Sequence, residues 1–267
     1  MEKIKAAAIQ ICASSNKEEN YKKVSHYVEQ AAGEGARFIV LPEHWDWLGK
    51  PQEKKSHAES PQGPSIQFAQ GLAKKFNCWL VAGTFAEQAA DEKPPYNTSL
   101  TIHPDGKIGK VYRKIHLFDA DVMGGHKESE WTSAGCEVVV EDLGWGKVGM
   151  SVCYDIRFPE LYRELAVQGA NVILIPANFT AYTGVAHWEV LVRARAIENQ
   201  CFVIAAGQTG VTGAGWEAHG YSMIVDPWGE ILASAGKEEG FITATLDFNR
   251  LKDVRAKMPV HSHRKLR

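Results

Sequence analysis

Cys153 is the residue in this sequence best placed to act as a nucleophile. It lies in the segment SVCYDIRFPE (151–160), where an apolar run gives way to polar and charged residues. A nucleophilic thiol needs such exposure, and it needs a neighbour that takes its proton or stabilises the thiolate. The simpler interpretation of a cysteine is a small buried apolar residue. That interpretation fits the cysteines within or beside apolar runs, Cys12, Cys78 and Cys201, while Cys136 is predicted to be a structural or exposed thiol.

Glu43 and Lys114 are the candidate partners of this thiol. Glu43 follows an apolar run, and burial beside Trp45 and Trp47 would raise its pKa toward that of a general base. Lys114 lies in the segment YRKIHLF (112–118), between a predicted strand and a predicted crossing loop. A carboxylate at a strand end is more often simply solvated, and a lone lysine is normally a surface residue. Each residue is therefore weak evidence by itself.

The elements that must position these residues follow a strand–helix–strand plan that occurs twice. In the first half we predict a helix that begins after the cap Asn16, a helix over 65–76, and strands over 4–11, 37–42, 78–85, 97–103 and 107–113, the last two joined by a turn at His103-Pro104-Asp105-Gly106. In the second half we predict helices over 159–168 and 186–199, and strands over 147–153, 171–176, 201–207 and on both sides of Asp226-Pro227-Trp228-Gly229.

This matched order is an internal pseudo-duplication and predicts an α/β fold. Each half forms a sheet with helices on one face, and the two sheets pack together around one core. We expect a single domain over residues 1–267, with the basic segment 247–267 at the surface or at a subunit interface. Glu43 and Cys153 are predicted to follow buried strands at equivalent positions of the two halves. Ligand sites of α/β sheets gather at such strand ends.

Composition excludes several classes of function. The chain of 267 residues has 30 Lys and Arg against 32 Asp and Glu, so it offers no basic surface for nucleic acid or an anionic membrane. Its five cysteines form no C-x-x-C pair and its ten histidines no H-E-x-x-H motif, which argues against a disulfide scaffold and a metal site. No segment has the features of a signal peptide or a membrane span. We expect a cytoplasmic protein with reduced thiols.

Together, the candidate residues and the sequence segments around them resemble those of the nitrilase superfamily of carbon–nitrogen hydrolases. These segments are LPE (41–43), YRKIHLF (112–118) and SVCYDIRF (151–158), and the resemblance extends over nearly the whole chain. It implies a four-layer α-β-β-α sandwich, chemistry without a metal or an organic cofactor, and at least a homodimer formed through residues 186–199 and the tail from Asp247.

The resemblance also implies a role for each residue of the site. Cys153 is the nucleophile, Glu43 the general base, and Lys114 stabilises the oxyanion together with the backbone N–H of Tyr154. Glu128, in HKESEW (126–131), matches a further glutamate that holds the lysine and the substrate.

Within the superfamily, the sequence is most similar to the branch of deaminated glutathione amidase and omega-amidase. Arg157 matches a residue that binds the substrate carboxylate, although it could instead pair with Asp155 or Glu160, and backbone groups of Phe179 and Thr180 match further carboxylate contacts. Asn178 and Tyr221 depart from the usual residues of the branch. We expect hydrolysis of deaminated glutathione to 2-oxoglutarate and cysteinylglycine. The alternatives are omega-amidase activity on 2-oxoglutaramate, hydrolysis of another small amide or carbamoyl compound, and an inactive binding protein of the same fold.

Overall fold

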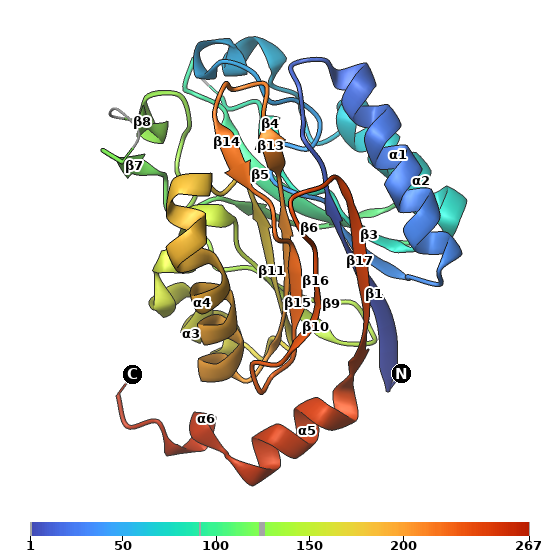
Figure 1. Ribbon diagram of the computed structural model, residues 1–267, viewed down its shortest axis with the longest axis vertical. Coiled ribbons are helices and arrows are strands. Elements are labelled where there is room, and N and C mark those ends of the chain that lie inside the picture. Colours follow the sequence, from blue (N-terminus) through green and yellow to red (C-terminus); the bar gives the residue numbers. More distant parts are fainter. Residues whose placement is uncertain (1, 91, 123–125, 267) are drawn as a thin grey trace.

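Two β-sheets pack face to face, and helices cover the outer face of each sheet (Figure 1). The computed structural model describes residues 2–90, 92–122 and 126–266. Helices α1 and α2 lie outside one sheet, and α3 and α4 lie outside the other (Figure 1). The predicted α-β-β-α sandwich is confirmed.

The first sheet is built from the N-terminal half of the chain and one late strand. Its strands, in spatial order, are β17 (Gly240–Asp247), β1 (Lys3–Gln10), β2 (Phe38–Val40), β3 (Trp79–Val81), β5 (Tyr96–Ile102) and β4 (Phe85–Glu87), with β6 (Ile108–Arg113) also paired to β5. Strands β1, β2 and β3 are parallel, and β5 runs antiparallel to β3.

The second sheet repeats this plan. Its strands, in spatial order, are β16 (Ile231–Ser234), β15 (Met223–Val225), β12 (Phe202–Gly207), β11 (Val172–Ala177), β10 (Lys147–Met150) and β9 (Val140–Asp142). Strands β10, β11 and β12 are parallel, and β15 runs antiparallel to β12. Two small ribbons lie outside the main sheets: β7 (Asp119–Ala120) with β8 (His126–Lys127), and β13 (Thr209–Val211) with β14 (Glu217–His219).

The repeated topology corrects one expectation about the site. In the matched halves β10 corresponds to β1 and β11 to β2, because each pair occupies the same place in its parallel trio. Glu43 follows β2, whereas Cys153 follows β10, so the two residues are not at equivalent positions. The residue equivalent to Glu43 is Asn178, which follows β11.

Helices α1, α2 and α3 agree with their predicted places, α4 begins earlier than predicted, and α5 and α6 were not predicted. Their bounds are α1 Lys17–Gly33, α2 Pro64–Phe76, α3 Pro159–Val167, α4 Ala181–Asn199, α5 Phe248–Lys257 and α6 Val260–His263, with 3₁₀ turns η1 Pro51–His57, η2 Glu128–Glu130 and η3 Cys153–Arg157. Asn16 caps α1 as predicted, since its side chain accepts hydrogen bonds from the backbone N–H groups of Glu18 and Glu19.

Alternating side chains of the buried strands fill two separate cores. Phe38 and Val40 of β2 point to the other sheet and pack in the core between the sheets. Ile39 and Leu41 point the opposite way and pack under α1 and α2. Both faces of β2 are therefore apolar, which explains the continuous apolar run read from the sequence.

Among the elements whose bounds differ from the prediction are one strand and one helix. The strand predicted over 78–85 breaks into β3 and β4 at Gly83, whose φ is +29° and whose backbone passes so close to Pro42 that a Cβ would lie 1.9 Å from the Pro42 carbonyl oxygen. Helix α4 begins at Ala181 rather than at 186. Gly184 lies within its first turns, where a Cβ would meet the ring of His219 at 2.2 Å.

The C-terminal segment forms α5 and α6, which extend beyond the end of the sheets (Figure 1). Phe248, Leu251 and Val254 of α5 are buried, and the Arg255 guanidinium donates a hydrogen bond of 2.9 Å to the Ala170 carbonyl. The segment is thus attached to the domain by packing. In the part of the chain that the structure describes, no helix has the length and apolar character needed to cross a bilayer.

Candidate active site

Glu43 lies in the interior just beyond β2, where several hydrogen bonds fix its carboxylate. Its Oε1 accepts from Asn97 Nδ2 at 2.8 Å and from Lys114 Nζ at 3.1 Å. Its Oε2 accepts from the backbone N–H of Asn178 at 2.6 Å, so the equivalent strand ends of the two sheets meet here. Its carbonyl accepts from Gln208 Nε2 at 2.8 Å. Glu43 is 2% exposed, and its geometry depends on both sheets.

Lys114 lies between two carboxylates. It follows β6, and its backbone N–H donates to the Asn97 carbonyl at 2.9 Å. Its ammonium donates to Glu128 Oε2 at 2.8 Å and to Glu43 Oε1 at 3.1 Å. Glu128 opens the 3₁₀ turn η2, and its Oε2 also accepts from the backbone N–H of Phe118 at 2.8 Å. The lysine is 2% exposed, so its position is fixed by charge and by packing.

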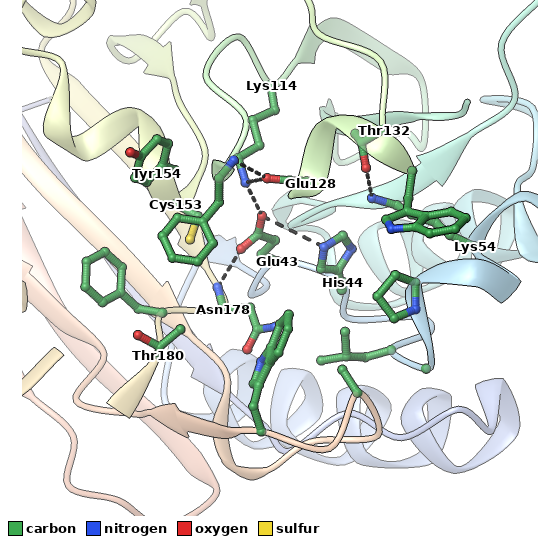
Figure 2. Close-up of a pocket in the computed structure, with 18 of the residues that line it drawn as sticks. Glu43, His44, Lys54, Lys114, Glu128, Thr132, Cys153, Tyr154, Asn178 and Thr180 are labelled. Atoms are coloured by element: carbon green, nitrogen blue, oxygen red, sulfur yellow. Dashed lines mark hydrogen bonds and ion pairs between the residues drawn. The ribbon is translucent and has the colours of Figure 1, made fainter. Parts of the chain in front are cut away.

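Cys153 occupies a sharp turn between β10 and η3. Strand β10 ends at Met150, and Cys153 adopts φ +47°, a left-handed conformation that is uncommon for a residue with a side chain. Its thiol lies beside Glu43 and Lys114 (Figure 2). The residue is 8% exposed and lines the pocket, so the thiol is reached only through that pocket.

Asp155 holds the turn that carries Cys153. Its fully buried carboxylate accepts from the backbone N–H of Val152 at 2.8 Å and from the Tyr112 hydroxyl at 2.6 Å. It also accepts from the backbone N–H of His116 at 3.0 Å and from His116 Nδ1 at 2.8 Å. One carboxylate therefore ties the residue before the thiol to the segment after Lys114.

The electrostatics of the cluster favour an ionised carboxylate beside a neutral thiol. Burial acts to raise the pKa of Glu43, but the charges of Lys114 and His44 and the hydrogen bond from Cys153 together outweigh it and leave this pKa below its ordinary value. Burial and the negative charge of Glu43 raise the pKa of the Cys153 thiol well above its usual range. Burial opposes the Lys114 charge, yet the carboxylates of Glu128 and Glu43 raise the pKa of this lysine. The resting protons thus belong to Cys153 and Lys114.

This electrostatic balance corrects the expectation of a raised pKa for Glu43. Trp47 lines the pocket, but Trp45 is turned to the other side of the sheet, where its indole packs against Tyr21 and Phe68. The dominant neighbour of the carboxylate is the Lys114 ammonium rather than an apolar ring.

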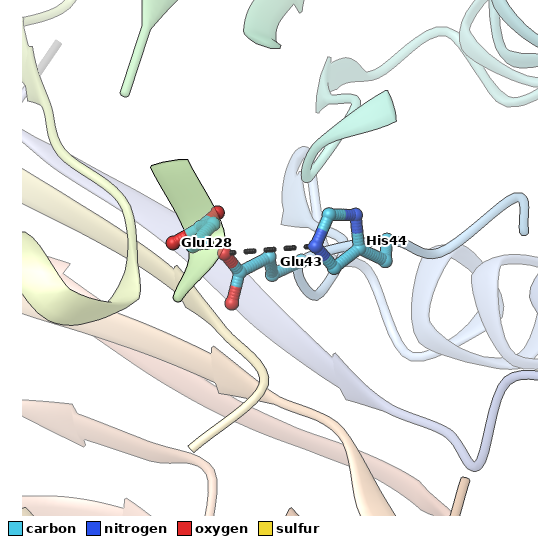
Figure 3. Close-up of side chains that lie close together, drawn as sticks. All are labelled: Glu43, His44 and Glu128. Atoms are coloured by element: carbon cyan, nitrogen blue, oxygen red, sulfur yellow. Dashed lines mark ion pairs between the residues drawn. The ribbon is translucent and has the colours of Figure 1, made fainter. Parts of the chain in front are cut away.

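Glu43, His44 and Glu128 also bring their side-chain ligand atoms within 4.8 Å of one another (Figure 3). Such a group of oxygen and nitrogen atoms could surround a cation. Here the Lys114 ammonium already lies against both carboxylates, and His44 Nε2 is 3.9 Å from Glu43 Oε1. The group is satisfied by the positive charge of the chain itself. The absence of a metal or cofactor requirement stays a prediction.

The remaining predicted residues surround the mouth of the same pocket. Arg157 is half-buried, and its guanidinium carbon lies 5.2 Å from the centre of the Phe179 ring and 5.7 Å from that of Tyr154. Its Nη1 contacts His187 Nδ1 at 3.2 Å. In the described part of the chain no carboxylate oxygen lies within 4.0 Å of it, so the expected alternative pairing with Asp155 or Glu160 is not observed.

Thr180 and Phe179 contribute the end of a helix to this mouth. The Thr180 side chain accepts a hydrogen bond from the backbone N–H of Thr183 and caps α4. The Phe179 carbonyl accepts from the His219 N–H at 2.8 Å, and both Phe179 and Thr180 line the pocket. Asn178 also lines the pocket, whereas Tyr221 does not belong to its described lining and instead accepts a hydrogen bond from the Trp188 indole through its carbonyl.

Several residues of the site could not be identified as functional from the sequence. Asn97 donates to Glu43 and, at 3.4 Å, to Glu128, although within a strand pattern it has no distinguishing feature. Lys54 is 7% exposed and donates from Nζ to Thr132 Oγ1 at 2.8 Å. The sequence PQEKKSH around it is typical of a solvated turn. Aromatic residues complete the wall, among them Trp47, Phe118, Trp131 and Trp216.

Comparison with known proteins identifies this arrangement. Residues 5–256 match the model of the carbon–nitrogen hydrolase family. The chain belongs to this family. The predicted membership of the nitrilase superfamily and the predicted amidase class are thereby confirmed.

Individual relatives within the family extend over almost the whole chain. A deaminated glutathione amidase of Synechocystis is 43% identical over 264 residues, covering 97% of each chain. The omega-amidase NIT2 of Danio rerio is 38% identical and covers 99% of this chain and 96% of its own. Nit3 of Saccharomyces cerevisiae, described as a member of branch 10 of the nitrilase superfamily, superimposes with a TM-score of 0.89 at 35% identity, covering 97% of this chain and 95% of its own.

Proposed function

We propose that this protein hydrolyses deaminated glutathione to 2-oxoglutarate and cysteinylglycine through a thioester on Cys153. The observation that carries the proposal is the buried cluster of thiol, carboxylate and ammonium on Cys153, Glu43 and Lys114, at the base of a pocket whose mouth holds the guanidinium of Arg157. The full-length similarity to deaminated glutathione amidases supports this choice of substrate.

In the first half of the reaction, the sulfur of Cys153 attacks the carbonyl carbon of the scissile amide. Glu43 accepts the thiol proton, and the carbonyl oxygen becomes an oxyanion that the Lys114 ammonium and the N–H of Tyr154 stabilise. The tetrahedral intermediate collapses with cleavage of the C–N bond, and Glu43 transfers the proton to the departing amine. Cysteinylglycine leaves, and a 2-oxoglutaryl thioester remains.

In the second half, water hydrolyses the thioester. Glu43 accepts a proton from the attacking water, and Lys114 again faces the oxyanion. Collapse expels the sulfur, which takes the proton back from Glu43 and regenerates the thiol. Glu128 has a positioning role, because its hydrogen bond of 2.8 Å holds the Lys114 ammonium in place while Glu43 changes its charge. The positive charges of Lys114 and Lys54 outweigh burial and lower the pKa of Glu128 to about 2, so this residue stays ionised throughout.

Arg157 is proposed to bind the carboxylate of the 2-oxo acid. A planar guanidinium matches a carboxylate with two parallel hydrogen bonds, and the rings of Tyr154 and Phe179 hold it in place. The backbone groups of Phe179 and Thr180 lie at the N-terminus of α4, where the helix dipole favours an anion. These groups together would fix the acyl part of the substrate.

Omega-amidase activity on 2-oxoglutaramate is the second candidate. Both substrates give the same 2-oxoglutaryl thioester, and the full-length similarity to NIT2 of Danio rerio supports this alternative. The two differ only in the leaving group, which is a dipeptide in one case and ammonia in the other.

The test is release of 2-oxoglutarate from both substrates by wild type and by Cys153→Ala. We expect wild type to turn over deaminated glutathione with the higher kcat/KM and Cys153→Ala to lose essentially all activity. A higher kcat/KM on 2-oxoglutaramate would assign the protein to the second candidate. A folded wild type inactive on both would refute the substrate proposal and direct the search to carbamoyl compounds, to other small amides, or to the inactive binding protein considered above.

The domain organisation, oligomeric state and cellular location of the protein remain predictions. We propose a single domain that forms a homodimer in the cytoplasm, with residues 186–199 of α4 and the segment from Asp247 at the interface. Exposed apolar residues on α4, Tyr182, Val185 and Val190, support that surface. Light scattering during gel filtration tests the oligomeric state, and a monomeric mass would contradict the proposal.

A further inference from the structure

Lys54 is a buried cation in the pocket, and its only part in the reaction described above is to help keep Glu128 ionised. It extends from η1, is 7% exposed, and lines the pocket. Within residues 2–90, 92–122 and 126–266, no carboxylate oxygen lies within 4.0 Å of its Nζ, which donates to the neutral hydroxyl of Thr132. Lys114, in contrast, contacts two carboxylates. A buried ammonium without a close anion is costly, so a bound anion would stabilise it strongly.

Lys54 and Arg157 lie on opposite sides of Glu43, the proposed general base. Figure 2 shows Lys54 beyond His44 on one side of Glu43, and Cys153 and Tyr154 on the other side. The guanidinium of Arg157 lies 5.7 Å from the Tyr154 ring, which places this second cation on the Tyr154 side. A ligand that reaches both cations must therefore extend across the carboxylate of Glu43.

The wall near Lys54 suits a peptide-like group. Trp47, Trp131 and Pro51 line the pocket with apolar surface. Pro51 opens η1, the turn that carries Lys54, and Trp131 precedes Thr132, which accepts the hydrogen bond of Lys54. The indole nitrogen of Trp47 is buried, and within the described residues it has no hydrogen-bond acceptor. It is thus a buried donor without a partner, on a ring that stacks on His57 at the end of η1, the turn that carries Lys54.

These observations fit the charges of one substrate class. The two products of deaminated glutathione, 2-oxoglutarate and cysteinylglycine, each carry a free carboxylate that the parent compound also has, one on each side of the scissile bond. 2-Oxoglutaramate has a carboxylate on the acyl side only. The departing nitrogen must face Glu43 to receive its proton, and Lys54 lies beyond Glu43 on the side away from Tyr154 (Figure 2).

We propose that Lys54 binds the carboxylate of the leaving group, so that the pocket selects amides with a carboxylate on each side of the bond that is cleaved. This inference rests on the proposed function and names the residue that separates its two candidate substrates. Thr132 holds the Lys54 ammonium toward the pocket before the substrate arrives. A purely structural role is the competing explanation, in which Lys54 only balances the negative charge of Glu128 and acts equally on every substrate.

The experiment compares Lys54→Met with wild type on three substrates. These are deaminated glutathione, its C-terminal glycinamide, which has the same leaving peptide without the charge, and 2-oxoglutaramate. Lys55→Met is the matched control, because the neighbouring Lys55 lies at the surface and pairs with the exposed Glu92 at 2.7 Å. Lys54→Arg retains the charge, and thermal unfolding of each variant verifies that it is folded.

We expect Lys54→Met to lower kcat/KM on deaminated glutathione about 100-fold, mainly through KM, and to change the other two substrates less than about 3-fold. Lys54→Arg should recover part of the loss, and Lys55→Met should behave as wild type. An equal loss on all three substrates would overturn the proposal in favour of the structural role.

Binding separates failure of this inference from failure of the proposed function. Calorimetry on Cys153→Ala and on Cys153→Ala/Lys54→Met requires no turnover. Tighter binding of deaminated glutathione than of its glycinamide, lost with Lys54, supports the subsite even if wild type hydrolyses neither compound. Equal binding of the two compounds refutes the subsite even if the hydrolysis is real.

Discussion

Replacement of Asp155 by Asn should weaken both the fold and the reaction, although the two side chains have nearly the same shape. The backbone N–H of Val152 donates to one carboxylate oxygen and the backbone N–H of His116 to the other. An amide has one oxygen, so its NH₂ group must face one of these donors. The Tyr112 hydroxyl and the His116 ring can reverse their roles, but a backbone N–H cannot.

The magnitude follows from these contacts. One buried backbone N–H without an acceptor costs about 1–3 kcal/mol, and loss of the charge weakens the remaining hydrogen bonds, giving about 3 kcal/mol in total. For a chain of this size that corresponds to a fall in Tm of roughly 6–12 °C. The turn of Cys153 and the segment after Lys114 lose their common anchor, so kcat should fall about 10- to 100-fold with a smaller change in KM.

Asp226→Asn is the matched control. Asp226 is buried at the hairpin turn of the second sheet, but the backbone N–H groups of Trp228 and Glu230 both donate to the same oxygen, Oδ1. An Asn there keeps both bonds and loses only the charged contact with Arg250. Urea denaturation and steady-state kinetics should show a cost of about 1 kcal/mol and an unchanged kcat. Equal stability losses in the two variants, or an Asp155→Asn enzyme with wild-type kcat, would refute the reasoning.

Three further predictions concern the pocket. The pKa of Glu43 lies below its ordinary 4.5 and that of the Cys153 thiol lies well above its ordinary 9.0, so the carboxylate stays ionised and the thiol stays protonated near neutral pH. We therefore expect kcat/KM to be constant from about pH 6 to about pH 8. A pH–rate profile that rises or falls within this range would contradict the prediction. Asn97→Ala removes the 2.8 Å bond to Glu43 and should lower kcat about 10-fold in steady-state assays with KM nearly unchanged, whereas a pure KM effect would be inconsistent with a positioning role. Arg157→Leu should raise KM for 2-oxo acid amides about 100-fold and leave a simple aliphatic amide unaffected, and comparable losses on both would argue against carboxylate binding.

The sequence contains the reacting groups but not their electrostatic setting. Three residues could be selected as catalytic candidates because each follows a predicted strand within a distinctive sequence segment: Cys153, Glu43 and Lys114. The structure brings their side chains together. Glu43 was expected to have a raised pKa from its neighbours in sequence. The decisive charge comes from Lys114, 71 positions further along the chain, and only the packing of the strands places it there.

Asn97 and Lys54 show why the rest of the site could not be predicted. Asn97 lies in β5, where alternation indicates only a strand. Its contact with Glu43, which follows β2, joins segments whose strands are separated in the sheet by β3. Lys54 belongs to a run of polar residues that indicates a surface turn, yet packing of η1 over the pocket buries it. Contacts between segments far apart in the sequence determine the position of such side chains, and a local sequence pattern does not predict these contacts.

The partition of the acyl-enzyme between water and hydroxylamine tests the central claim, a covalent thioester on Cys153, most directly. Deaminated glutathione and its glycinamide have different leaving groups but give the same 2-oxoglutaryl thioester. At a fixed hydroxylamine concentration, we therefore predict the same ratio of hydroxamate to hydrolysis product from both substrates, whatever their individual rates. Each product is counted together with the oxime that hydroxylamine forms on its 2-oxo group. Ratios that differ between the two substrates, or turnover without any hydroxamate, would contradict the account.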